Sequence, residues 1–125
     1  MNMEEENTVL FERKNDNYLV ICDHASNRIP KNYNNLELDK VIINSHRAYD
    51  IGASDVAKEL SSKLNCSLIM TNYSRLLIDP NRGMDDPTLI PKLSEGVIIK
   101  GNIGITNIKN DRERLKRIKI FYLPY

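Results

Sequence analysis

The stretch YLVICDH, residues 18–24, indicates the class of fold. Four apolar residues in succession, from Leu19 to Cys22, end abruptly at Asp23 and His24. A short continuous apolar run of this kind, followed at once by polar residues, is typical of a strand buried in a parallel or mixed sheet. Polar side chains at the carboxyl end of such a strand lie where open α/β sheets bind their ligands. The stretch therefore predicts a buried strand and the beginning of a site.

A helix is expected downstream of this strand, over residues 53–64. Apolar residues recur there at the spacing of one helix face, the pattern typical of the face that a helix buries. The five residues on this face are Ala53, Val56, Ala57, Leu60 and Leu64. Asp50 or Ser54 is the expected N-cap, since their short side chains can accept a bond from the first turn. Asn65 is expected to close the helix.

The other elements complete an alternation of strands and helices, which favours an α/β fold. In chain order they are a short strand at 8–11 within a polar lead-in over 1–17, a loop at 30–35, a helical or mixed segment at 36–46, a strand at 66–74, a loop at 83–91, a hairpin or flap at 95–105, and a helix that begins at Asp111.

Composition excludes several classes of protein. The chain has 125 residues, 18 basic and 17 acidic, so its net charge is 18 − 17 = +1. A balance this even argues against nucleic-acid binding through a broad positive field. No apolar run approaches the ~20 residues that a membrane-spanning helix needs, and the acidic N-terminus does not resemble a secretory signal. Cys22 and Cys66 form no CxxC motif and are expected to be buried thiols of a cytoplasmic protein.

Histidine supplies the first candidate for chemistry. His24, directly after a buried strand, could be a metal ligand or a general base, or could simply bond to its own loop. His46 and Asp50 are four residues apart and could share a helix face. For this pair we favour an ordinary helix start, with Asp50 as the cap.

A second candidate is the polar cluster on both sides of the apolar residues 76–78. It contains Arg75, Asp79, Asn81 and Arg82. Arginine holds a carboxylate through two parallel hydrogen bonds, so the cluster could bind an acidic ligand. It could equally be a surface ion pair, which contributes about 0–1 kcal/mol. The basic stretch 112–119 is expected to be the solvated face of the last helix.

Four segments in this order resemble the N-formylglutamate amidohydrolase family. They are CDHASNRIP at 22–30, HRAYDIGA at 46–53, SRLLIDPNR at 74–82 and DRERLKRIKIFYLPY at 111–125. The resemblance begins near Val20 and covers most of the chain after it. It implies a three-layer α/β/α fold with a mixed sheet, similar to the zinc carboxypeptidase and aspartoacylase group. It also implies hydrolysis of an N-acyl amino acid, such as N-formyl-L-glutamate, to formate and glutamate.

The resemblance also implies roles for particular residues. His24 is the implied ligand of zinc or another divalent metal. The aspartoacylase-like pattern has a glutamate ligand where this chain has Asn27, which leaves Asp23 and Asp50 as alternatives and assigns Asn27 to substrate binding. Asn81 and Arg82 are the implied carboxylate binders. Asp79 orients them, and Arg75 adds a second positive contact.

Finally, the resemblance implies a longer domain, of which residues 18–125 form the N-terminal half. Further ligands and the catalytic residues are expected in a C-terminal half, which could be encoded separately. Two alternatives to a truncated hydrolase stay open at this point. The chain could be a non-catalytic module that binds a small acidic ligand, or one subunit of a split hydrolase.

Overall fold

The computed structural model describes residues 6–106 and 111–125. Its centre is a mixed sheet of three strands, β1 (Thr8–Phe11), β2 (Asn15–Cys22) and β3 (Cys66–Thr71), in the order β1-β3-β2. β2 runs parallel to β3, and β1 runs antiparallel to it. The predicted α/β class with a mixed sheet is therefore confirmed.

The strands lie close to where the sequence predicts them. β1 is the short strand expected inside the polar lead-in, of which residues 1–5 are outside the described part. β2 begins at Asn15, four positions before the apolar run, and β3 ends at Thr71 rather than Ser74. Both shifts fall at the polar ends of the strands, where the apolar pattern gives the least information.

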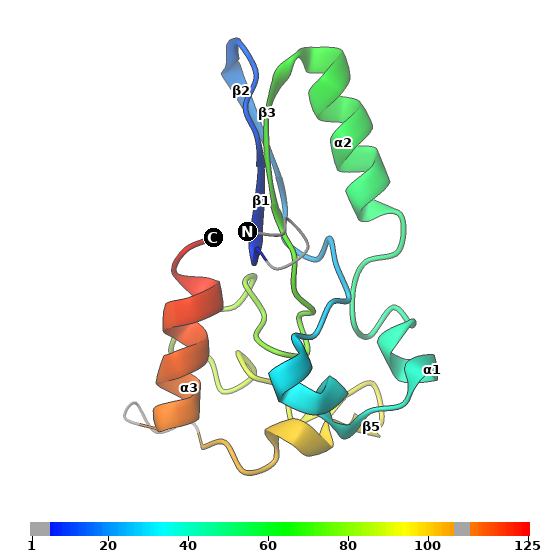
Figure 1. Ribbon diagram of the computed structural model, residues 1–125, viewed down its shortest axis with the longest axis vertical. Helices are drawn as coiled ribbons and strands as arrows, with labels where there is room; N and C mark the ends of the chain where they lie inside the picture. Colours follow the sequence, from blue (N-terminus) through cyan, green and yellow to red (C-terminus); the bar gives the residue numbers. More distant parts are fainter. Residues whose placement is uncertain (1–5, 107–110) are drawn as a thin grey trace.

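Helix α2 (Ala53–Leu64) packs along one face of the sheet (Figure 1). Ala57 is buried there with Leu68 and Met70 of β3. Among the described residues α2 is the one helix that packs extensively on the sheet, which is the arrangement of an incomplete α/β domain. The periodicity of residues 53–64 correctly predicts both the helix and its length.

The ends of α2 differ in how well they could be predicted. Asn65 closes the helix in a left-handed conformation, as expected, with φ 51°. The N-cap, however, is Gly52 with φ 86°, not Asp50 or Ser54. Glycine tolerates this left-handed conformation without strain. The carboxylate of Asp50 is instead turned toward a histidine and an arginine from other parts of the chain.

Below the sheet, the remaining elements surround a second and larger core (Figure 1). They are η2 (Lys31–Glu37), α1 (Lys40–Ile43), β4 (Leu93–Ser94), β5 (Val97–Ile98), η3 (Lys100–Asn102), α3 (Arg112–Arg117) and the π-helical turn η4 (Ile118–Tyr122). The centre of this core is the buried run Leu76–Ile78. The 3₁₀ helix η2 occupies most of the predicted loop at 30–35. A hairpin is present, as one of the two alternatives predicted for 95–105, but its strands β4 and β5 lie within 93–98, and η3 occupies part of the remaining range.

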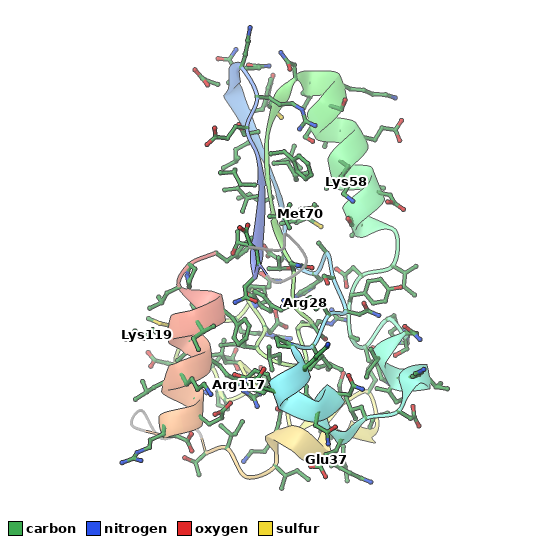
Figure 2. The ribbon with its side chains drawn as sticks, viewed as in Figure 1. Arg28, Glu37, Lys58, Met70, Arg117 and Lys119 are labelled. Atoms are coloured by element: carbon green, nitrogen blue, oxygen red, sulfur yellow. The ribbon has the colours of Figure 1, made fainter. Side chains whose placement is uncertain are left out.

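The last helix begins at Asp111 as predicted, and the side chain of Asp111 accepts a bond from the Arg114 amide. Its basic residues are not all solvated, which corrects the sequence interpretation. Arg114 and Arg117 are only 3% and 2% exposed. Figure 2 shows Arg117 on the side of α3 that faces the core and Lys119 on the outer side. Arg117 can be buried because it donates to the Leu77 carbonyl and to the carboxylate of Glu113, which neutralises its charge.

Two expectations from composition concern the whole described chain. Cys22 and Cys66 are both buried and unpaired, as predicted. In the described ranges, no helix is long and apolar enough to cross a bilayer.

Candidate active site

The site is centred on His24, in the loop that directly follows β2. Its imidazole is largely buried, with 11% of the side chain exposed. Nε2 lies 2.7 Å from Oδ1 of Asp79, and Nδ1 lies 3.2 Å from Oδ2 of Asp50. The Asp50 amide also donates to the His24 carbonyl. The structure therefore brings together three residues that the sequence placed in three separate motifs.

The ionic state of this group follows from its contacts. The hydrogen bond to Asp79 raises the pKa of His24, more than burial lowers it. Burial raises the pKa of Asp79, but the bonds from His24 and from the Asn81 amide outweigh it and leave this pKa below its ordinary value. Both shifts favour an imidazolium paired with a carboxylate.

Arg75 fixes the loop that carries Asp50. Its Nε donates to the Arg47 carbonyl at 2.9 Å, and its Nη2 donates to the His46 carbonyl. Nη1 lies 3.1 Å from Oδ1 of Asp50 and 3.3 Å from Nδ1 of His24. Since these contacts use most of the donors of the guanidinium, Arg75 primarily positions other site residues.

Beside this group is a pocket of about 280 Å³ that carries three guanidinium groups. Its lining includes Arg47, Arg75, Arg82, Asp79, Thr88 and Glu95. The Arg82 side chain is 53% exposed, and its one ion pair within the described residues joins Nε to Oδ2 of Asp79 at 3.7 Å. Arg82 therefore keeps donors for a ligand, whereas Arg75 keeps few. The pocket is suited to an anion with a planar carboxylate.

The other wall of the pocket comes from the β4–β5 hairpin. Glu95, at the tip of this hairpin, accepts a bond from His46, and Arg47 Nη2 lies 3.4 Å from the Glu95 carbonyl. His46 makes no contact of this kind with Asp50 in the described structure, so the two do not form the pair that their spacing allows. The hairpin is thus tied to the loop at 46–50 that Arg75 also fixes.

Asp23 directly precedes His24 in the chain. Its Oδ1 accepts a hydrogen bond from the Tyr125 hydroxyl at 2.7 Å. Burial and this bond to a carboxylate raise the pKa of Tyr125. Because 102 positions separate the two residues, no local pattern could have paired them.

Two asparagines that the resemblance assigns to the substrate do not line the pocket. The Asn27 amide donates to the Ile43 carbonyl at 3.0 Å and lies 3.2 Å from the Asn44 side chain. It thereby holds the end of α1. Asn81 contributes its main-chain N–H to Asp79 at 2.9 Å. Substrate binding by Asn27 and Asn81 stays a prediction.

The described residues do not by themselves form a catalytic metal site. Catalytic zinc usually takes three protein ligands and a water. No three histidine, cysteine, aspartate or glutamate side chains of the described ranges are grouped to hold a metal ion. Moreover, one nitrogen of His24 is bonded to Asp79 and the other lies next to the Arg75 guanidinium, whose charge repels a cation. A metal ligand role for His24, Asp23 and Asp50 stays a prediction.

Comparison with known families fits this arrangement. Residues 16–125 match the family model for N-formylglutamate amidohydrolase. The chain belongs to the N-formylglutamate amidohydrolase family. The match includes His24, the loop at 46–50 and the cluster at 75–82, so these site residues all lie within the matched part of the chain.

A solved structure agrees with this assignment. The crystal structure of a gene product from Agrobacterium tumefaciens is 34% identical and superposes with a TM-score of 0.85. The match covers 98% of this chain but 47% of the other, so the chain spans about half the length of this relative. A search of the curated proteins found no match.

Proposed function

We propose that the protein hydrolyses the amide of an N-acyl amino acid such as N-formyl-L-glutamate, giving formate and glutamate. The described residues would bind a carboxylate of this substrate. The observation that supports this is the pocket in which Arg82 and Arg47 lie beside the His24–Asp79 pair. A substrate carboxylate held by these arginines would place the rest of the molecule near the imidazole.

Each described residue has a distinct part in this proposal. Arg82 binds the carboxylate, and Asp79 orients Arg82 through its second oxygen. His24, held by its hydrogen bond to Asp79, would lie near the bound ligand. Arg75 holds the loop with Asp50 in place. The residues that activate water are expected outside the described ranges.

Zinc or another divalent metal belongs to the proposal as an expectation from the resemblance. The residues of this chain that could hold the ion are His24 and either Asp23 or Asp50. The other ligands would come from the expected C-terminal half. When bound, such an ion would polarise the carbonyl of the substrate and lower the pKa of a bound water. We expect the 125-residue chain, equilibrated with zinc and then desalted, to retain well below one ion per chain. Elemental analysis measures this, and one firmly held zinc per chain would contradict it.

The carboxylate pocket can be tested by binding. We expect Arg82→Gln to weaken binding of N-formyl-L-glutamate roughly tenfold to a hundredfold, because a hydrogen bond between charged groups contributes about 1.5–3 kcal/mol. Isothermal titration calorimetry measures the change. Arg112→Gln is the matched control, since Arg112 is exposed on α3 and does not line the pocket. Equal affinity for the diamide of the ligand, which has no carboxylate, would refute the proposal.

A second candidate function is non-catalytic binding of a small acidic ligand. It is favoured by the lack of a three-ligand metal group in the described residues. The two functions differ in one measurement, the release of formate when the chain is combined with the remainder of a family member. Binding without release under those conditions favours the binding module.

A cytoplasmic location is proposed on composition alone.

A further inference from the structure

The outer edge of β2 is open and apolar. In the order β1-β3-β2, β2 has no neighbour on its outer side among the described strands. Soluble proteins usually protect such edges with charge, proline, bulges or a covering element. From Leu19 to Cys22 β2 is paired regularly with β3, and its Leu19 and Ile21 side chains are 52% and 58% exposed.

Helix α2 adds exposed apolar side chains beside the same edge, on the other face of the sheet. Val56 and Leu60 are 66% and 47% exposed, although they share the predicted inner face of the helix with the buried Ala57. With Ile51, they border a groove of about 490 Å³ that runs along residues 20–22 of β2. The apolar face of α2 therefore reaches beyond the sheet. We call Leu19, Ile21, Ile51, Val56 and Leu60 the β2 surface.

The strand register shows what would cover this surface. Leu10 of β1, Ile69 of β3 and Ile21 of β2 are paired across the sheet, so their side chains lie in one row on one face. Val20, on the opposite face, packs in the cluster under α2. A further strand beside β2 would extend the row with one set of side chains and fill the groove under α2 with the other.

The related crystal structure indicates where such a strand comes from. The chain superposes almost end to end on it, yet more than half of the related chain lies beyond the match. We propose that the β2 surface binds a polypeptide equivalent to this unmatched part, which adds a strand to the outer edge of β2. Since His24 follows β2 directly, the bound polypeptide would also border the site. This inference goes beyond the proposed function and does not depend on the identity of the substrate.

Co-expression tests the proposal. The tagged 125-residue chain is produced together with the unmatched part of the Agrobacterium tumefaciens protein, and native mass spectrometry measures the complex. We expect a one-to-one complex, and Ile21→Asp or Val56→Asp should reduce its yield at least tenfold. Val41→Asp is the control, because Val41 is 77% exposed on α1, away from the β2 surface. Loss of the complex in all three variants would argue against this surface.

A fused chain provides a second measurement that does not depend on the solubility of the separate part. In a single chain that joins the two segments, amide hydrogen exchange of residues 15–22 should slow at least tenfold relative to the 125-residue chain alone. Unchanged exchange in a folded fusion would overturn the proposal. Self-association of the 125-residue chain that Ile21→Asp abolishes would also overturn it, since the occupant would then be a second copy.

Discussion

Gly101→Ala is expected to destabilise the protein by about 2 kcal/mol, within the range for overpacked cores. A Cβ at this position would lie 2.6 Å from Cα and 2.9 Å from the carbonyl carbon of Leu36. These are main-chain atoms, which cannot rotate away as a flexible side chain could. Leu36 is 1% exposed and has φ 53°. Its main chain is therefore surrounded by packed atoms and has little room to move away from the new Cβ.

The collision would also reach the site. Next to Gly101, the side-chain Nδ2 of Asn102 donates to the carbonyls of Leu76 and Pro91, at 2.7 and 2.8 Å. Leu76 and Pro91 both line the arginine pocket. Displacement of η3 would therefore loosen two walls of the pocket, and we expect weaker ligand binding along with lower stability.

Urea denaturation, followed by circular dichroism, measures this effect. Gly104→Ala is the matched control, because its Cβ would meet nothing within 4 Å and its φ is outside the left-handed region. The control should be neutral or slightly stabilising, since alanine restricts the unfolded chain more than glycine does. Equal midpoints for the two variants would show that η3 and η2 are not packed as closely as described.

The sequence predicts the parts of the site better than their assembly. His24 is identified by its place after a continuous apolar run, and Asp79 by its place after another. Both signals are local. Neither shows that the two side chains meet at 2.7 Å, because 55 positions separate them and the order of the strands decides the contact.

Residue type alone also could not show that Arg75 and Arg82 have different roles. The sequence assigns both to a carboxylate, yet Arg75 donates to the carbonyls of Arg47 and His46, whereas the half-exposed Arg82 is paired with Asp79. Those carbonyls belong to main chain, which every residue has, so no motif marks them. The same reason explains why the buried arginines of α3 were expected to be solvated.

Arg117→Met is expected to destabilise the protein by about 3 kcal/mol. This is the size of effect seen when one partner of a buried ion pair is removed. Arg117 Nη1 donates to the Leu77 carbonyl at 2.9 Å and to Asn102 Oδ1 at 2.7 Å, and Nε lies 2.9 Å from Glu113. Its guanidinium also lies 4.9 Å from the centre of the Tyr33 ring. Methionine keeps much of the length but leaves these acceptors without a donor.

Lys63→Met is the matched control for this experiment. Lys63 and Glu59 form an ion pair at the same i, i+4 spacing as Glu113 and Arg117, at 3.1 Å, but the Lys63 side chain is 74% exposed. Its loss should change the unfolding free energy by less than about 0.5 kcal/mol. Equal small losses in the two variants would mean that apolar packing replaces the Arg117 contacts, as it does for some buried ion pairs. A large loss for Arg117→Met alone would show that the buried contacts of Arg117 with Leu77 and Asn102 stabilise the fold.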